Sequence, residues 1–433
     1  MSGIWWLGFC WDLSFGIWDL SSAHPWLRTR LSVHMLLTYA MWGAWAPVLG
    51  KYLFNIGFAP ERIALVYGTG ALATMVSPLI AGQIADRWFA TEKFLAVSYA
   101  VSGALFLYAT QLREFTPFWW TAFIAMCFYM PTLALGNSMS FHHLADPRRD
   151  FPPVRVWGTI GWIAGGWGLW AWLTQAQAHG WPGQSLRTCL ALAGGIALLN
   201  ALYSLTLPHT PPNRDARAKF AAGEAFAMMR HPPFAVLTVG AFLLMLFATF
   251  YFTGASIFFP TIGVTDENLS LVQSVGQWAE ILTVLVLPPV YLKLGPRRTL
   301  LLGLAAWTAR FGLMAAADSV AWILAAQVLH GACFAFVLAA ASIWVEEVCP
   351  ADARASVQNL LSFFYYGLGM FAGSFLASRV TAHFTVGSGV LLWPRIWLVP
   401  AAGCGAVLIL FLLGFHPRRK ETESRRDGET ENR

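Results

Sequence analysis

Apolar stretches long enough to cross a lipid bilayer recur along almost the whole chain, with only short charged or proline-rich breaks between them. A hydrocarbon core about 30 Å thick requires about 20 apolar residues in a helix. Only 12% of the residues are charged, whereas soluble domains carry about 25%. One buried core cannot absorb so many apolar stretches. The sequence therefore predicts an all-α membrane protein with many spans, and not a soluble enzyme.

The apolar windows predict twelve transmembrane helices. They lie near residues 31–54, 63–85, 94–111, 117–138, 153–174, 187–207, 234–259, 269–292, 298–317, 320–345, 355–379 and 389–415. The only long break, 208–233, is rich in proline and basic residues. It predicts a central loop between an N-terminal six-helix bundle, 31–207, and a C-terminal six-helix bundle, 234–415. A basic and polar tail follows at 416–433.

The first 30 residues form a tryptophan-rich extension in which aspartates are interspersed. They lack the basic start and the small-residue cleavage site of a signal peptide. One interpretation is an interfacial segment, because tryptophan favours the headgroup zone. The other is a start codon assigned too far upstream. We assign this extension no function.

Lysine and arginine are distributed unevenly between the two sides of the predicted spans. When the N-terminus, the central loop and the C-terminus share one side, 21 basic residues lie there and six lie on the other side, with Arg310 inside a span. An excess of basic residues marks the cytoplasmic side. We therefore expect both termini and the central loop in the cytoplasm.

Two six-helix halves joined by a cytoplasmic loop are typical of the major facilitator fold, whose substrate site lies between the halves near the membrane midplane. The loop after the second span, Gly82-Gln-Ile-Ala-Asp86-Arg87, resembles the loop signature of that superfamily. Gly82 would permit close helix approach, and Asp86 and Arg87 would tie neighbouring helices. The equivalent loop after the eighth span, 293–298, lacks the aspartate. A plain charged turn is the alternative interpretation.

Two charged residues lie deep inside predicted spans, Glu280 in the eighth and Arg310 in the ninth. A charge at the bilayer centre costs about 2.5–3.5 kcal/mol on insertion scales, so such residues usually face a cavity or a partner. Each lies thirteen residues from the connecting turn, counted from Lys293 and from Arg297, which places both about 20 Å from it. Glu280 is either a substrate-binding or proton-titrating carboxylate, or one half of a buried ion pair that locks two helices.

Two further patterns indicate a polar cavity. Gln273, Gln277 and Glu280 recur at i, i+4 and i+7, so they share one helix face, and polar side chains at this depth need an aqueous or protein neighbour. In the fifth span Arg155, Thr159 and Trp162 share a face. Glycines 158, 161, 165 and 168 predict a surface for close helix packing in the same span. Snorkelling of Arg155 to the headgroups is the alternative.

Several of these segments resemble the bacterial nucleoside:proton symporter family of the major facilitator superfamily, over about residues 31–415. The motifs that carry the resemblance are Met130-Pro-Thr-Leu-Ala-Leu, Asp150-Phe-Pro-Pro-Val-Arg155-Val-Trp-Gly-Thr159-Ile-Gly, Gln277-Trp-Ala-Glu280, Ala306-Trp-Thr-Ala-Arg310-Phe and His330-Gly with Phe334. The resemblance implies a secondary transporter of the bacterial inner membrane that takes up a nucleoside with a proton by alternating access. It implies substrate binding by the residues at the matching positions, which are Arg155, Thr159, Trp162, Gln277, Glu280, His330 and Phe334.

The resemblance also makes Glu280 the candidate for proton coupling, while Gly82, Asp86, Arg87 and Arg310 are expected to have structural or gating roles. Trp162 stands where the family has a phenylalanine, and this chain departs from the family pattern at four further substrate-site positions. Ala335 replaces an aspartate, His330 a tyrosine, and Thr249 and Phe252 a glutamine and an asparagine in an ungapped alignment. These departures predict altered selectivity more than loss of transport.

Two rival functions remain open at this point. One is a major facilitator transporter of another small polar metabolite, such as a sugar or an aromatic acid, and the other is a membrane sensor that binds without transporting. A membrane enzyme is disfavoured, because no paired carboxylates, nucleophile triad or His/Cys cluster occurs at membrane depth. We expect a monomer in the lipid bilayer with no cofactor, metal, disulfide framework or nucleic-acid partner.

Overall fold

The fold was analysed in a computed structural model, which describes residues 25–80, 89–181, 185–211, 227–349, 354–387 and 389–417. Most of the N-terminal extension, most of the central loop and almost all of the C-terminal tail therefore lie outside the described residues. The same holds for Gly82, Asp86 and Arg87, so the predicted loop signature is not placed.

Helices account for nearly all of the described chain, and all twelve predicted spans coincide with helical segments. The first half contains α2 (Pro25–Trp45), α3 (Leu49–Asn55), α4 (Pro60–Ile80), α6 (Thr91–Ala109), α7 (Phe115–His143), α8 (Pro147–His179) and α9 (Thr188–Ser204). The second half contains η2 (Met228–Arg230), α11 (Pro232–Thr261), α12 (Leu269–Ala316), α13 (Val320–Phe334), η3 (Ala335–Ala339), α14 (Ala340–Val348), α15 (Arg354–Ser362), η4 (Phe363–Gly369), α16 (Met370–His383) and α17 (Trp393–Gly414). A short hairpin of β1 (Thr385–Val386) and β2 (Val390–Leu391) precedes α17.

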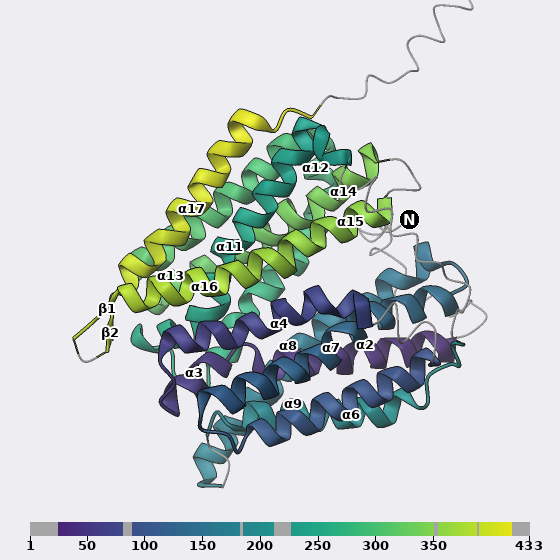
Figure 1. The fold of residues 1–433 in the computed structure, drawn as a ribbon, viewed down its shortest axis with the longest axis vertical. Coiled ribbons are helices and arrows are strands. Elements are labelled where there is room, and N and C mark those ends of the chain that lie inside the picture. Colours follow the sequence, from purple (N-terminus) through teal and green to yellow (C-terminus); the bar gives the residue numbers. More distant parts are fainter. Residues whose placement is uncertain are drawn as a thin grey trace, which may run out of the picture.

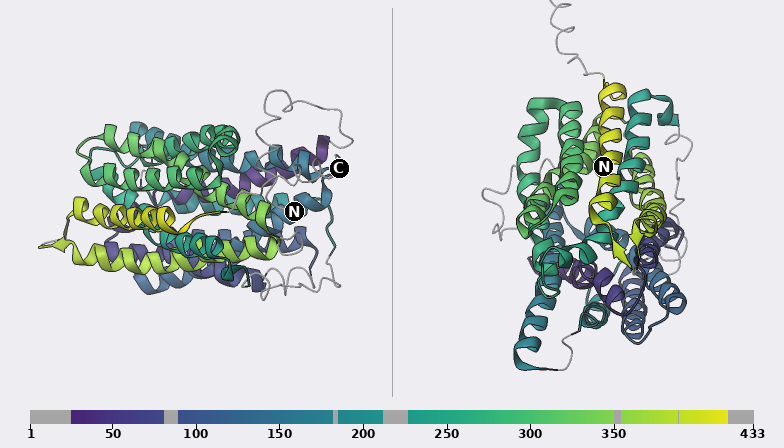
Figure 2. Two further views of the ribbon diagram at one scale, coloured as in Figure 1. Left: turned by 90° about the horizontal axis from the view of Figure 1, so that it is seen from above. Right: turned by 90° about the vertical axis from the view of Figure 1, so that its left-hand side faces the viewer.

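The two halves form two groups of helices that pack side by side. In Figure 1 the helices α2–α9 lie below and α11–α17 lie above, and the right-hand view of Figure 2 shows the same division. Within the first group α2 packs along α8, and α6 along α9; within the second, α12 packs against α13 and α17. The groups meet where α4 contacts α16 and η4, and where α8 contacts α12. The candidate site lies along this seam.

The helix α12 is bent into two arms at Gly295, whose φ of 77° and ψ of 169° are not helical. Glycine adopts this backbone region without the penalty that a Cβ imposes, and Pro296 directly after it cannot continue the hydrogen-bond ladder. The two arms correspond to the eighth and ninth predicted spans. The break therefore lies where the sequence predicts a turn, and the two arms form a helical hairpin.

The two halves differ in how apolar their helices are. By length and composition alone, six described helical segments qualify as membrane-crossing, and five of these belong to the second half. The first-half helices carry buried polar side chains in their interior, among them His34, Thr38 and Asn200, which hydrogen-bond to one another across α2 and α9. A polar network that faces other helices lowers the hydropathy of a span without exposing polar groups to lipid.

Large apolar side chains cover the outside of the helices. Leu202, Leu282, Leu292 and Leu413 are 68%, 64%, 71% and 76% exposed. Soluble monomers rarely show apolar surface on this scale, whereas lipid solvates it at no cost. The exposed leucines are consistent with membrane-spanning helices in both halves.

Candidate binding site between the helix groups

Glycines in α8 bring its backbone into direct contact with α2. A Cβ placed on Gly161 would lie 2.1 Å from the carbonyl oxygen of Leu36, and one on Gly165 would lie 2.1 Å from that of Ala40. No side chain fits at either position. The predicted small-residue surface is thus confirmed there and at Gly158, which lies against Tyr39, but it is wrong for Gly168, where no atom lies within 4 Å.

This packing fixes the candidate residues of α8. The guanidinium carbon of Arg155 lies 4.4 Å from the centroid of the Tyr39 ring, a cation–π contact. Arg155 also interacts electrostatically with Glu280 of the opposite helix group. Thr159 and Trp162 follow on the same face, and both are half-buried. The structure thus places Arg155 toward the seam between the groups.

A second glycine contact joins α12 to α13. A Cβ on Gly276 would lie 3.1 Å from the Cβ of His330, and one on Gly331 would lie 2.2 Å from the carbonyl oxygen of Ala279. Because the two backbones lie this close, short side-chain distances follow between the polar face of α12 and His330.

The resulting cluster joins four of the predicted residues. Nε2 of Gln277 lies 3.3 Å from Nε2 of His330, and Oε2 of Glu280 lies 3.7 Å from the same ring nitrogen. The His330 ring lies 4.4 Å from the ring of Phe334, centroid to centroid. The side chain of Glu280 is 30% exposed and that of His330 is 4% exposed. The cluster therefore has a carboxylate that faces open space and an imidazole behind it.

The predicted polar stripe of α12 is divided between two environments. Gln277 and Glu280 are half-buried at the seam. Gln273, one turn earlier, is buried; its Nε2 donates to the carbonyl oxygen of Pro47 at 2.6 Å, and its Oε1 accepts a bond from the hydroxyl of Tyr251 at 3.5 Å. The interpretation of all three side chains as cavity lining is therefore wrong for Gln273, which joins the two helix groups directly.

Arg310 does not pair with Glu280, so the alternative of a locking ion pair between them is wrong. Its Nε donates to the carbonyl oxygen of Ala326 at 3.1 Å, and its Nη2 donates to Oε1 of Gln327 at 2.9 Å. Its guanidinium carbon lies 3.9 Å from the centroid of the Tyr251 ring. Arg310 is fully buried. The two charges therefore lie at equal depth in the hairpin but have different partners.

The four departures from the family pattern fall into packing positions or into the cluster itself. Ala335 is buried. The Thr249 hydroxyl donates to the carbonyl oxygen of Met245 within α11, at 2.7 Å. Phe252 is half-buried, with its ring 5.6 Å from that of Tyr251. Of the four positions, only His330 brings a polar side chain next to Glu280.

Sequence reasoning missed Tyr39 and Tyr366. Tyr366 is exposed and interacts electrostatically with Glu280, Tyr39 and Arg155. It lies in η4, a π-helical segment, and π turns are frequent at functional sites. Its neighbour Tyr365 is buried, and its hydroxyl has no hydrogen bond from the described residues. Face counting at 3.6 residues per turn does not apply to a π-helical segment.

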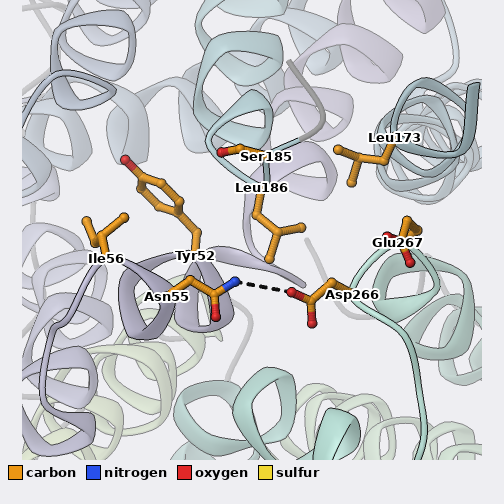
Figure 3. Close-up of a pocket in the computed structure, with 8 residues that line it drawn as sticks. All are labelled: Tyr52, Asn55, Ile56, Leu173, Ser185, Leu186, Asp266 and Glu267. Atoms are coloured by element: carbon orange, nitrogen blue, oxygen red, sulfur yellow. Dashed lines mark hydrogen bonds between the residues drawn. The ribbon is translucent and has the colours of Figure 1, made fainter. Parts of the chain in front are cut away.

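Among the described residues, direct polar contacts between the groups gather at the end that carries α3 and the α11–α12 loop. Asp266 lies 3.7 Å from Nζ of Lys51 and accepts a bond from Asn55 at 3.1 Å. Trp170 and Trp167 donate to Asn268 and Ser274 at 3.1 and 2.9 Å. Figure 3 shows the Asn55–Asp266 bond at the edge of a cavity of about 280 Å³. Under the predicted orientation this end faces away from the cytoplasm.

Comparison with known proteins identifies the family. The sequence model of the nucleoside H⁺ symporter family matches residues 26–420. This chain belongs to the nucleoside H⁺ symporter family. It is 30% identical over 415 residues to the xanthosine permease of Escherichia coli, which covers 90% of this chain and 96% of the permease. It is 27% identical over 406 residues to the nucleoside permease NupG of the same organism, covering 88% and 94% of the two chains.

Solved structures agree with this assignment. A crystal structure of a single-residue variant of the nucleoside transporter NupG matches with a TM-score of 0.81 and 25% identity, covering 90% of this chain and all of the other. A bacterial homologue of the lysosomal transporter Spinster matches with a TM-score of 0.66 at 13% identity, which speaks to the fold alone. The predicted major facilitator fold is confirmed, as is membrane transport rather than enzymatic activity. The roles of individual site residues stay predictions.

Proposed function

We propose that this proton-coupled nucleoside transporter binds its substrate at the seam between α8 and the α12–α13 pair. The observation that carries the proposal is the cluster of Gln277, Glu280 and His330, which faces Arg155 across the seam. Polar and charged side chains at membrane depth are costly unless they line a cavity or bind a partner. Here they come from both helix groups, as an alternating-access site requires.

The chemistry of the cluster fits a nucleoside. A ribose presents vicinal hydroxyls, which donate to a carboxylate such as Glu280 and exchange bonds with an amide such as Gln277. A nucleobase is flat and aromatic, and Phe334 and Trp162 offer faces for stacking. Arg155 supplies donors for base carbonyl groups. Thr159, one turn along the same face, supplies a hydroxyl.

Glu280 is proposed as the proton-coupling group. Protonation removes the charge of a carboxylate, and the neutral carboxyl group is buried in a low-dielectric seam at a smaller desolvation cost than the charged form. Protonation with substrate bound would let the contacts of Asp266 and Gln273 close the outer end while the opposite, cytoplasmic end opens. Return of the empty site would follow release of the proton to the cytoplasm.

The rival cargoes fit less well. A sugar has the hydroxyls but no flat ring for Phe334 and Trp162. An aromatic acid has the ring, but its carboxylate is repelled by Glu280 unless Arg155 compensates. The expected order of competition for uptake is therefore nucleosides first, then aromatic acids and sugars.

The test is uptake of tritiated xanthosine and uridine by proteoliposomes, with and without an inward proton gradient. Glu280→Gln keeps the shape and polarity of the side chain but cannot titrate, so gradient-driven accumulation should fall to the level of diffusion while downhill exchange persists. Glu114→Gln, an exposed site before α7, is the matched control and should accumulate like wild type. Accumulation by Glu280→Gln at the wild-type rate would refute its role. Binding with no uptake by the wild type would favour a sensor.

Three further features belong to this proposal. We place the protein in the bacterial inner membrane with both termini in the cytoplasm, because 21 basic residues gather on that side. The two bundles, 31–207 and 234–415, act as the moving units, joined by 208–233. The carrier works as a monomer, because both halves of the site come from one chain. Accessibility of tags placed at each terminus in spheroplasts tests the orientation.

A further inference from the structure

The contact between Gln277 and His330 joins two nitrogen atoms. Nε2 of the amide lies 3.3 Å from Nε2 of the imidazole, and Oε2 of Glu280 lies 3.7 Å from that same ring nitrogen. The other ring nitrogen, Nδ1, is buried and neither donates nor accepts a hydrogen bond among the described residues. One imidazole nitrogen thus serves two neighbours of opposite character, an amide donor and a carboxylate acceptor.

This geometry depends on the protonation state of His330. An amide nitrogen only donates, so the contact requires a lone pair on Nε2 and hence a neutral ring with its proton on Nδ1. A protonated ring carries hydrogen on both nitrogens. Nε2 then donates to Glu280, and the Gln277 amide must turn by half a rotation to present its oxygen. The two arrangements differ by one proton and one amide rotation.

The ring itself has little freedom to move. Gly276 lies against the His330 side chain, where even an added methyl group would be 3.1 Å from Cβ and Cγ. Phe334 packs on the ring at 4.4 Å. Gln277, by contrast, is half-buried and borders the seam. A change of charge on His330 is therefore accommodated by rotation of the Gln277 amide rather than by movement of the ring.

We infer that His330 is a second proton-binding residue of the site. Its protonation rotates the amide of Gln277 by half a turn, so that the group presented to the nucleoside changes between a hydrogen-bond donor and an acceptor. The inference rests on the proposed substrate site. It makes substrate affinity depend on proton occupancy through a hydrogen bond, in addition to the charge of Glu280. His330 is a positioning residue in this scheme, because it acts on the substrate through Gln277.

Charged and titratable groups face His330 from several elements. Burial of the imidazole opposes its protonation most strongly and Arg310 of α12 opposes it further, while Glu280 of α12 attracts an imidazolium. From α11, the Tyr251 ring lies 5.9 Å away. Arg155 of α8 and Tyr366 of η4 act on Glu280. A proton on His330 is thus balanced only while Glu280 is ionised, so the pair holds its protons in a coupled way.

The test measures equilibrium binding of tritiated xanthosine and uridine to purified protein between pH 5 and pH 8, without a gradient. In the wild type we expect affinity to change by about tenfold over this range, the size of one hydrogen bond gained or lost. His330→Gln and His330→Tyr replace the imidazole by groups that do not titrate in this range. Both should bind more weakly and show a flatter pH profile, with only the part due to Glu280 remaining.

A double-mutant cycle separates coupling from packing. In Gln277→Leu the pH dependence carried by His330 should already be lost, so adding His330→Gln should not flatten the profile further. A merely structural role would lower affinity equally at every pH and leave the profile unchanged. Superimposable profiles for wild type and both His330 variants would overturn the inference. Absence of nucleoside binding by the wild type at every pH would instead defeat the proposed function.

Discussion

Glu280 and Arg310 occupy equivalent places in the hairpin of α12 and yet lie in opposite environments. Each is thirteen residues from the turn. Glu280 is 30% exposed at its side chain, next to a histidine and across the seam from Arg155. Arg310 is fully buried and is held by neutral partners, Gln327 and the Ala326 carbonyl group, and by the ring of Tyr251.

The depth of a residue in the hairpin and the direction of its side chain are set by different features. Spacing along a hairpin fixes how deep two residues lie, because the rise per residue is constant. It does not fix which neighbours they meet, because these come from helices distant in sequence. A buried charge that is held by hydrogen bonds and an aromatic ring stabilises one packing arrangement. A charged group at an open seam can gain or lose a proton and can bind a ligand. We expect substitutions at the two positions to act on different properties.

The largest effect on folding is expected at Arg310. Arg310→Met removes two charge-assisted hydrogen bonds and a cation–π contact and leaves Gln327 without its donor, at a cost of about 3 kcal/mol. Arg310→Lys keeps the charge but not the planar fork, so it should recover only part of the loss. Thermal denaturation in detergent, followed by size-exclusion chromatography, measures both. Glu280→Gln is the matched control and should melt near the wild-type temperature. A similar loss in Glu280→Gln would erase the distinction between the two sites.

The comparison also shows what the sequence predicts and why it stops there. The twelve helices and the break at Gly295 follow from bilayer thickness and backbone chemistry, which act locally. The half-buried faces of Arg155 and Glu280 follow from polar residues that recur at helical spacing. The partner of Arg310 does not follow, because Gln327 and Tyr251 lie on other helices. Tyr366 is missed because the π-helical η4 shifts the register of its face.

The next largest effect distinguishes Gln273 from Gln277, one turn apart on α12. Gln277→Leu should weaken nucleoside binding by about tenfold, through loss of one hydrogen bond. Gln273→Leu should change the affinity for nucleoside by less than about threefold, but it removes the hydrogen bond to the Pro47 carbonyl group and so weakens the contact between the two helix groups. Spin labels at Glu114 and Asp318, one in each half, should report a longer distance in Gln273→Leu only. Equal losses of affinity in both variants would contradict the division of the polar stripe.

The smallest effect is expected for the ion pair of Lys51 and Asp266. Its side chains are 17% and 33% exposed and 3.7 Å apart, and such pairs contribute about 0.2–1 kcal/mol. Lys51→Met and Asp266→Asn should each change the apparent affinity for nucleoside by less than about fivefold, with a coupling energy below about 1 kcal/mol in a double-mutant cycle. The effect should shrink further in high salt, because exposed pairs are screened. Uptake kinetics at two ionic strengths measure it. A coupling as large as the loss at Arg310 would mean that this outer contact contributes far more to holding the two helix groups together than an exposed ion pair does.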